Sequence, residues 1–251
     1  MRFEGQRIAV TGGAGEIGAR IVAKLLAEGA TVIVLDRQSP VSSAAGHIAC
    51  DLADPAGLEA LALAMAAAPW DILINLAGVQ YFGPMEGETP DSLRRTLAIN
   101  LLAPMRLAQA VAPGMRARGR GQIVNIGSIF GSINFAHFAS YSSSKAGLRA
   151  FSQALRRELA GSGVDVTYIA PRAVKTAFNS AKVLQFASLT KMAMDDPGAV
   201  ATRIVDAIAA RRRDVYLGFP ESFFVRLNAL FPALVDRALA ADDRKVRRLF
   251  A

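Results

Sequence analysis

Short apolar segments alternate with longer amphipathic segments along most of the chain, and this alternation restricts the fold more than any other feature. The apolar segments have the length of buried strands and fall at residues 7–11, 31–35, 47–50, 71–75, 122–126, 164–169 and 215–217. The amphipathic segments have the length of helices and fall at residues 16–28, 55–67, 90–116, 140–159 and 197–210. Strands joined by helices in this way form parallel sheets. The pattern therefore predicts an α/β fold with helices on both faces of a parallel sheet.

The composition supports one large hydrophobic core. The chain has 251 residues, of which 52% are hydrophobic, and this content is sufficient for a sizeable core. No internal repeat, low-complexity block or linker interrupts the alternation. We therefore expect a single domain at residues 1–220, followed by a helical extension at residues 221–251.

Charge and cysteine content restrict the partners and the location. The net charge is +8, but the basic residues are mostly scattered rather than clustered, so we expect no nucleic-acid partner. No apolar run reaches the ~20 residues of a membrane-spanning helix, and the N-terminal residues lack the apolar region of a secretory signal. The single cysteine, Cys50, excludes internal disulfides and fits a cytoplasmic location. The sequence shows no ligand cluster for a metal ion.

A glycine-rich turn, Thr11-Gly-Gly-Ala-Gly-Glu-Ile-Gly18, joins the first predicted strand to the first predicted helix. Gly13, Gly15 and Gly18 satisfy the G-x-G-x-x-G spacing, which is typical of dinucleotide-binding turns at this position. Glycines allow a tight turn and a close backbone approach, and the N-terminus of the following helix favours a pyrophosphate. We therefore expect Thr11, Gly12, Ile17 and their neighbours in the turn to bind a dinucleotide cofactor.

Two acidic residues lie at the ends of the next strands. Asp36 ends the second predicted strand, where a carboxylate can accept hydrogen bonds from both ribose hydroxyls and repels a 2′-phosphate. This favours NAD over NADP. The adjacent Arg37 leaves NADP open, because a guanidinium there could meet a 2′-phosphate. Asp51, just beyond the third predicted strand, is expected near the adenine edge.

Three polar side chains form a candidate catalytic site. Tyr141 and Lys145 are four residues apart in a predicted helix, so both side chains leave the same face. A nearby ammonium lowers the pKa of a phenol, and such a tyrosine can exchange a proton with an alcohol or carbonyl oxygen. Ser128, at the end of a predicted strand, is placed to hydrogen-bond the same oxygen. These residues predict a hydride-transfer site beside a nicotinamide cofactor.

Taken together, these motifs resemble those of the short-chain dehydrogenase/reductase family over about residues 5–220. The matching motifs are Thr11…Gly18, Asp51-Leu52, Asn75-Leu-Ala-Gly78, Asn100, Ser128, Tyr141-x-x-x-Lys145 and Pro171…Thr176. The resemblance implies a doubly wound, Rossmann-like sheet of seven parallel strands. It also implies NAD(P)-dependent interconversion of a carbonyl and a secondary alcohol. The Ser128–Tyr141 spacing and the short C-terminal region favour the short, single-domain branch of the family.

The resemblance assigns a role to each of these positions. Tyr141 would be the acid/base, Lys145 would hold the nicotinamide ribose and lower the pKa of Tyr141, and Ser128 would position the substrate oxygen. Asn100 would anchor a water molecule that relays protons between Lys145 and solvent. The remaining cofactor contacts would come from Leu52, Asn75, Ala77, Gly78, Pro171, Val174 and Thr176.

The chain departs from the family pattern at three positions. Glu16 stands where the short branch has glycine, and its carboxylate must either point away from a pyrophosphate or cap the helix. Leu76 replaces the second asparagine of N-N-A-G. Arg172 replaces the glycine after Pro171, and we expect it to face solvent rather than a cofactor phosphate or an acidic substrate.

Two alternatives to the oxidoreductase remain open from the sequence. The T-G-x-x-G-x-x-G form of the turn is typical of the longer family branch, so a nucleotide-sugar epimerase or dehydratase with tightly held NAD is one. A non-catalytic, cofactor-binding regulatory protein is the other, suggested by Glu16 and Arg172.

Apolar residues predict the substrate class and further contacts. We expect a mainly apolar pocket for a small-molecule substrate, rimmed by Tyr81, Phe82, Phe130, Ile133, Phe135, Phe138, Phe178, Val183, Leu184, Phe186, Leu189 and Met192. Residues 222–251 place apolar side chains, from Phe223 to Ala238, at helical spacing. That stripe could pack on the domain or a neighbouring subunit, or could bind an anionic membrane at its inner face. The resemblance implies a homo-oligomer, a dimer or tetramer, built on the helices at 90–116 and 140–160.

Overall fold

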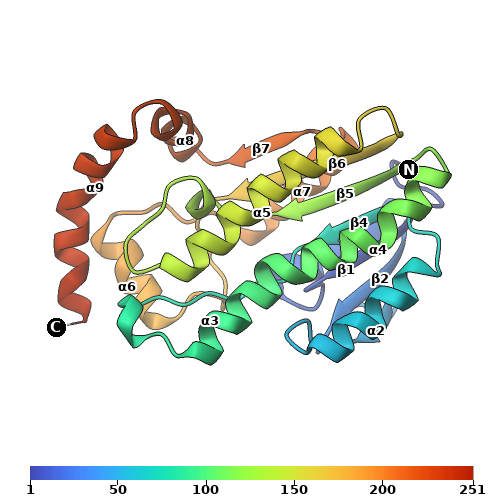
Figure 1. Ribbon diagram of the computed structural model, residues 1–251, viewed down its shortest axis with the longest axis horizontal. Coiled ribbons are helices and arrows are strands. Elements are labelled where there is room, and N and C mark those ends of the chain that lie inside the picture. The colour runs from blue at the N-terminus through green and yellow to red at the C-terminus, as the bar shows by residue number, and fades with distance from the viewer. Residues whose placement is uncertain (251) are drawn as a thin grey trace.

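The computed structural model describes residues 1–250 and contains one seven-stranded, fully parallel sheet (Figure 1). The strands are β1 (Arg7–Thr11), β2 (Thr31–Asp36), β3 (Gly46–Ala49), β4 (Ile72–Asn75), β5 (Gly121–Ile126), β6 (Val164–Pro171) and β7 (Asp214–Leu217). Their order in the sheet is β3-β2-β1-β4-β5-β6-β7. The predicted doubly wound, Rossmann-like sheet is confirmed.

Helices cover both faces of the sheet. The helices are α1 (Glu16–Ala27), α2 (Pro55–Ala66), α3 (Pro90–Leu97), α4 (Ala103–Ala117), α5 (Ala139–Glu158), α6 (Ala181–Leu189), α7 (Pro197–Ala209), α8 (Glu221–Leu230) and α9 (Pro232–Val246). Helices α1 and α7 pack together on one face, and α2, α4 and α5 cover the other, nearer face in Figure 1. Consecutive side chains of β1 point to opposite faces of the sheet. Ile8 and Val10 belong to the core under α1 and α7, and Ala9 belongs to the core under α2, α4 and α5. Burial on both sides explains why the strands are nearly all apolar.

The crevice that binds ligands in such sheets lies where the strand order reverses. Strand β1 pairs with β2 on one side and with β4 on the other, so Thr11 is level with both Leu35 and Asn75. The connections that leave β1 and β4 therefore diverge at the carboxyl ends of these strands. This divergence opens a crevice beside the glycine-rich turn.

The long helix predicted at 90–116 is one continuous helical segment with an irregular turn inside it. A π-helical stretch, η2 (Ala98–Leu102), separates α3 from α4. The irregular turn therefore lies just before Pro104. The irregular turn contains Asn100, which is fully buried, and π-turns inside helices frequently occur at functional sites.

Arg172 does not face solvent, so the sequence-based prediction was wrong. Its guanidinium pairs with Asp195 at 2.6 Å and with Glu221 at 3.0 Å, and it also donates to the carbonyl oxygen of Phe219 at 3.0 Å. The Arg172 side chain is 16% exposed. The acidic partners come from segments 23 and 49 residues later in the chain. Arg172 thus fastens the end of β6 to the start of the C-terminal extension.

The extension forms two helices joined by a tight turn, followed by a short 3-10 turn, η4 (Arg247–Leu249). Its inward side chains are Val225, Val235 and Val246, whereas much of the predicted apolar stripe faces outward. Within residues 1–250, the helices are all too short or too polar to cross a membrane. The division into a domain at 1–220 and an extension at 221–251 stays a prediction.

Candidate active site

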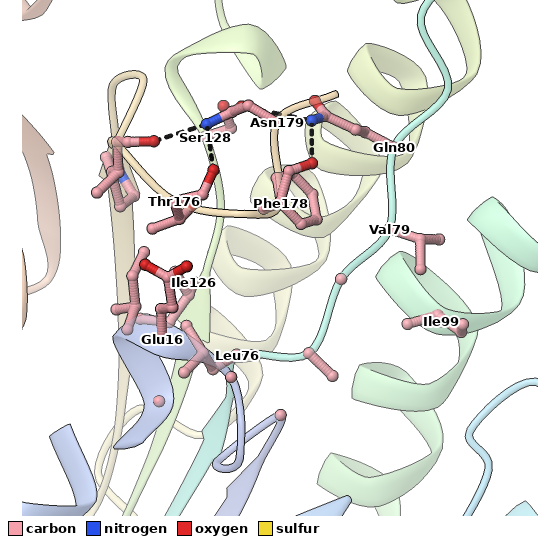
Figure 2. A pocket seen from close by; sticks show the side chains of 18 of the residues that line it. Glu16, Leu76, Val79, Gln80, Ile99, Ile126, Ser128, Thr176, Phe178 and Asn179 are labelled. Atoms are coloured by element: carbon pink, nitrogen blue, oxygen red, sulfur yellow. Dashed lines mark hydrogen bonds between the residues drawn. The ribbon is translucent and has the colours of Figure 1, made fainter. Parts of the chain in front are cut away.

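A cavity of about 590 Å³ opens at the carboxyl ends of the strands. The glycine-rich turn and the ends of β2, β4, β5 and β6 form one part of its lining, and α5 and α6 form another. Figure 2 shows the cavity with Glu16 and Leu76 at one end and Ser128, Thr176 and Phe178 toward the other. This is the crevice expected from the sheet order.

Most of the predicted site residues line this cavity. They are Gly12, Gly15, Glu16, Ile17, Gly18, Asp36, Arg37, Asp51, Leu52, Ala77, Gly78, Ser128, Tyr141, Lys145, Pro171, Val174 and Thr176. Four others lie behind its wall: Thr11, Gly13, Asn75 and Asn100. The structure therefore brings together residues that are up to 164 positions apart in the chain, from Gly12 to Thr176.

The glycine-rich turn is held by close backbone contacts. Gly12 has φ +70°, and a Cβ atom there would lie 2.8 Å from the Cα of Ala77. A Cβ atom on Gly18 would lie 2.2 Å from the carbonyl oxygen of Gly12. Gly13 packs against Val34, where a Cβ atom would come within 2.8 Å. Only glycine fits at these positions, because the opposing atoms are backbone or buried side chain.

The first turn of α1 offers backbone donors to a ligand. The helix begins at Glu16, and its N-cap residue, Gly15, has no side chain to cap the helix. Free N–H groups and the positive end of the helix dipole attract a phosphate. A dinucleotide pyrophosphate fits this cradle, and the close Gly12–Gly18 approach leaves the turn tight enough to present it.

Two residues behind the wall fix the turn to its neighbours. The Thr11 hydroxyl accepts hydrogen bonds from the backbone N–H groups of Leu76, at 3.0 Å, and Ala77, at 3.1 Å. Asn75 donates to the side-chain oxygen of Asn125 at 2.8 Å. The Thr11 bonds position the segment after β4, and the Asn75 bond joins the ends of β4 and β5. Their role as cofactor contacts stays a prediction.

Glu16, the first residue of α1, points its carboxylate away from the glycine-rich turn. Its carboxylate accepts a hydrogen bond of 2.8 Å from the backbone N–H of Ala177. That residue lies in the segment after β6, so Glu16 links α1 to the opposite wall of the cavity. The carboxylate is therefore engaged by a donor rather than blocking the glycine-rich turn, as one of the two sequence-based expectations required.

The acidic residues at the strand ends also bind backbone amides. Asp36 accepts from Ala14 N–H at 3.1 Å and from Gln38 N–H at 3.1 Å. Asp51 accepts from Ala53 N–H at 2.9 Å. Each carboxylate is thereby oriented at the cavity edge. Arg37 is exposed beside Asp36 and also lines the cavity.

Ser128, Tyr141 and Lys145 converge at the buried end of the cavity. Their exposed fractions are 8%, 8% and 4%. Burial raises the pKa of Tyr141, and a hydrogen bond with the Ser128 hydroxyl opposes this increase. Burial lowers the pKa of Lys145 to about 8. These are the effects expected when a phenol and an ammonium leave water.

Within the chain itself, the expected lowering of the Tyr141 pKa by Lys145 is not found. The Lys145 ammonium donates to the carbonyl oxygen of Ile126 at 3.0 Å and lies 6.0 Å from the centroid of the Tyr141 ring. Burial of the phenol outweighs the hydrogen bond from its neighbour. Tyr141 is therefore a protonated phenol at neutral pH.

Asn100 joins the irregular turn to both the β4 loop and α5. Its side-chain oxygen accepts from Val79 N–H at 2.9 Å, and its amide donates to Val79 carbonyl at 2.8 Å and to the Ser144 hydroxyl at 3.0 Å. Ser144 precedes Lys145, so Asn100 fixes the turn of α5 that carries the lysine.

Two polar residues that the sequence did not indicate hold the segment after β6 across the cavity. The Asn179 amide donates to the carbonyl oxygens of Val174, at 2.7 Å, and Thr176, at 3.4 Å. The Gln80 amide donates to the carbonyl oxygen of Phe178 at 3.0 Å. Figure 2 shows these bonds as dashed lines: those of Asn179 stay within the segment after β6, and that of Gln80 joins this segment to the one after β4. Neither residue belongs to a recognisable motif, so no sequence signal marked them.

Half of the predicted apolar rim lines the cavity. The lining members are Phe130, Phe138, Phe178, Val183, Phe186 and Met192. The others, which do not line it, are Tyr81, Phe82, Ile133, Phe135, Leu184 and Leu189. Phe82 and Phe135 pack behind the lining rings: the Phe82 and Phe138 centroids are 4.6 Å apart, as are those of Phe130 and Phe135. The aromatic wall is thus two rings thick.

Comparison with known proteins places this geometry in a family. A family model described as short chain dehydrogenase matches residues 6–185. "Dehydrogenase/reductase SDR family member 7B" of Rattus norvegicus is 31% identical over 267 residues, which cover 96% of this chain and 82% of that protein. The chain belongs to the short-chain dehydrogenase/reductase family. It is therefore an NAD(P)-dependent oxidoreductase.

Other members of the family also resemble the chain over most of its length. "Ketoacyl reductase HetN" of Nostoc sp. is 32% identical over 253 residues, covering 93% of this chain and 88% of that protein. A solved gluconate 5-dehydrogenase-like protein from Beutenbergia cavernae, described with bound NADP, has a TM-score of 0.77 and 28% identity, over 85% of this chain and 95% of that one. A short-chain dehydrogenase from Leptospira borgpetersenii, described with bound NAD+, has a TM-score of 0.73 and 25% identity, over 85% and 91%.

Proposed function

We propose that this short-chain dehydrogenase/reductase interconverts a carbonyl and a secondary alcohol on an apolar substrate, with Tyr141 as the acid/base. The observation that carries the proposal is the convergence of Ser128, Tyr141 and Lys145 at the buried, aromatic end of a cavity whose other end is the phosphate-binding turn. A reacting oxygen at that end would meet the Ser128 and Tyr141 hydroxyls, with Lys145 close behind them.

The side chains divide the proton chemistry between them. The Ser128 hydroxyl orients the substrate oxygen by a hydrogen bond. The Tyr141 phenol donates its proton to that oxygen during reduction and accepts it back during oxidation. Because burial raises the pKa of Tyr141, the phenol holds its proton at neutral pH, which is the state that reduction requires. Bound NAD(P) supplies or accepts the hydride.

Lys145 and Asn100 would restore the proton. Lys145 has a pKa of about 8, so its ammonium can release and recover a proton within the physiological range. Asn100 donates to the hydroxyl of Ser144, the residue before Lys145, at 3.0 Å. We propose that Asn100 helps to hold a water molecule that links Lys145 to solvent.

We propose NAD as the preferred cofactor. The Asp36 carboxylate is fixed at the end of β2 by the Ala14 amide, 3.1 Å away, where it would accept from the ribose hydroxyls and repel a 2′-phosphate. Arg37 stands next to it and is the residue through which NADP could still bind. Leu52, Ala77 and Gly78 would contact the adenosine. Toward the other end of the cavity, Thr176 and Val174 would contact the nicotinamide.

The substrate is proposed to be a hydrophobic ketone, secondary alcohol or acyl-type compound. Phe130, Phe138, Phe186 and Met192 surround the reacting end of the cavity, and a site of this kind binds apolar groups by excluding water. The name of the Nostoc relative, a ketoacyl reductase, agrees with this substrate class.

We further propose a cytoplasmic homo-oligomer. Leu97, Leu102 and Met105, on the α3–α4 segment, are 39%, 57% and 38% exposed, and a second subunit could cover them as a dimer or tetramer. The 222–251 segment is left available to a membrane surface.

The test is a panel of ketones and secondary alcohols, assayed by the absorbance of reduced cofactor with NAD and with NADP. Tyr141→Phe is expected to bind cofactor as the parent does and to lose turnover by at least ~100-fold. Near-normal turnover in that variant would remove Tyr141 from its role. Cofactor that survives gel filtration without net turnover of NADH would instead support the epimerase alternative.

A further inference from the structure

The turn between α8 and α9 presents an uninterrupted apolar surface. All six residues from Ala229 to Leu234 are exposed and apolar. Leu230 is 72% exposed, Phe231 59% and Leu234 54%. Runs of this length are normally avoided on protein surfaces unless they serve a contact. The nearby side chains of Phe223 and Phe224, which are 53% and 40% exposed, enlarge the apolar surface.

The turn is exposed although the helices that carry it are packed. Val225 of α8 and Val235 of α9 are buried in a cluster with Ile129 and Ile133. The Asn228 amide donates to the carbonyl oxygen of Ser132 at 2.8 Å. The outward face is therefore not a core face that has lost its partner, because both helices already have an inward one.

Basic residues flank the apolar turn. Arg226 precedes it and Arg237 follows it, and both are exposed. Further along α9 and beyond, Arg244, Lys245, Arg247 and Arg248 are exposed as well. The one exposed acid among the near neighbours of the turn is Asp236. Exposed apolar side chains between cations are what an anionic lipid surface binds.

The same extension packs behind the wall of the substrate cavity. Val246, at the end of α9, is buried in a cluster with the cavity-lining Phe138 and Phe186. Phe250 lies 5.2 Å from Phe82 between ring centroids. Figure 1 shows α9 beside α6, beyond the carboxyl ends of the strands. The apolar turn and the substrate cavity are thus two ends of one packed element.

We propose that residues 229–234 insert into the boundary between headgroups and acyl chains of an anionic membrane, and that the enzyme takes a hydrophobic substrate dissolved in that membrane. This proposal rests on the proposed function, because the membrane would serve as the source of the hydrophobic carbonyl or alcohol substrate that enters the cavity. A second copy of the chain is the poorer occupant. A symmetric contact centred on the apolar turn would bring the flanking arginines, Arg226 and Arg237, of two subunits close together, and like charges repel.

The test is cosedimentation of the full chain with phosphatidylcholine vesicles, with and without phosphatidylglycerol. Leu230→Ser combined with Phe231→Ser is expected to lower partitioning onto anionic vesicles at least ~10-fold. The matched control, Val41→Ser with Leu63→Ser, removes two exposed apolar side chains elsewhere, which are 83% and 67% exposed, and should leave partitioning within ~2-fold of the parent.

A second pair of variants tests the charge. Arg226→Gln with Arg237→Gln should weaken binding to anionic vesicles ~10-fold and should leave binding to phosphatidylcholine unchanged. Arg116→Gln with Arg203→Gln, two exposed arginines elsewhere, is the control.

Turnover of a water-soluble ketone should be the same in all these variants. This separates the two proposals. Absence of turnover in the parent would refute the proposed oxidoreductase function, whereas unchanged vesicle binding by the Leu230→Ser, Phe231→Ser variant would refute the membrane-binding surface. Conversion of a parent dimer to a monomer by the turn variant, without vesicle binding by either, would assign the surface to a second copy and overturn the membrane proposal.

Discussion

Replacing Lys145 by methionine should reveal the free-energy cost of burying its ammonium. Burial lowers the pKa of Lys145 from 10.5 to about 8, so the unfolded chain binds more protons than the folded chain between these values. The folded state is therefore penalised in full below pH 8, and stability rises with pH between about 8 and 10.5. At 1.36 kcal/mol per pKa unit, the penalty amounts to ~3 kcal/mol.

Urea unfolding of the parent and of Lys145→Met from pH 7 to pH 10 measures this directly. At pH 7 the variant should be the more stable protein, by the ~3 kcal/mol burial penalty reduced by ~1 kcal/mol for the lost hydrogen bond to Ile126. This advantage should shrink as the pH rises. Other titrating groups are shared by both proteins and cancel in the difference. Lys175→Met is the control, because an exposed lysine is hydrated in both states, so its curve should run parallel to that of the parent. A pH-independent difference for Lys145→Met, or one that grows with pH, would refute the reasoning.

Three further predictions concern the glycine-rich turn, Asp36 at the end of β2, and Arg172 with its two acidic partners. Gly18→Ala forces a Cβ atom to 2.2 Å from the carbonyl oxygen of Gly12, so it should cost ~1–3 kcal/mol of stability and abolish cofactor binding. The control is Gly114→Ala in α4, where the nearest atom to the new Cβ belongs to a flexible side chain 3.4 Å away, and this variant should gain ~0.5–1 kcal/mol of stability. Denaturant unfolding and cofactor fluorescence measure both variants. Asp36→Ala should raise the ratio of kcat/KM for NADP to that for NAD at least ~10-fold, and an unchanged ratio would remove Asp36 from cofactor selection. Arg172→Met should lower the free energy of unfolding by ~1–3 kcal/mol, because two carboxylates lose their partner. Arg94→Met is the control and should lower it by less than ~0.5 kcal/mol, because the pair of Arg94 with Asp91 is exposed. Equal losses in the two variants would contradict the account.

The sequence predicted the features whose causes are local. Alternating apolar segments specify a covered parallel sheet, and the spacing of Gly13, Gly15 and Gly18 specifies a tight turn before a helix. The four-residue spacing of Tyr141 and Lys145 on α5 likewise needs only helical geometry to place both groups on one face. These local patterns are enough to name the fold, and the site that lies on it follows from the sheet order.

Features that depend on distant partners were out of reach of the sequence. Arg172 is drawn away from solvent by a partner, Glu221, that lies 49 residues further along the chain. Glu16 has a hydrogen-bond donor because it meets Ala177, 161 residues away. The helical spacing of the tail predicted an apolar stripe, but it could not show that Val225 and Val235 point inward while Phe223 and Leu230 point outward. The direction of the Tyr141 pKa also required the burial of its ring, which no spacing reveals.

The most direct test of the central claim follows deuterium from the cofactor. The parent enzyme and Tyr141→Phe would each be incubated with 4-deuterated NADH and a ketone that the panel shows to be reduced, and the alcohol would be analysed by mass spectrometry. The account predicts deuterium at the carbinol carbon from the parent and almost none from the variant, although both bind the cofactor with similar affinity. Equal labelling by the two proteins would contradict it, because the phenol at the buried end of the cavity would then have no part in the reaction.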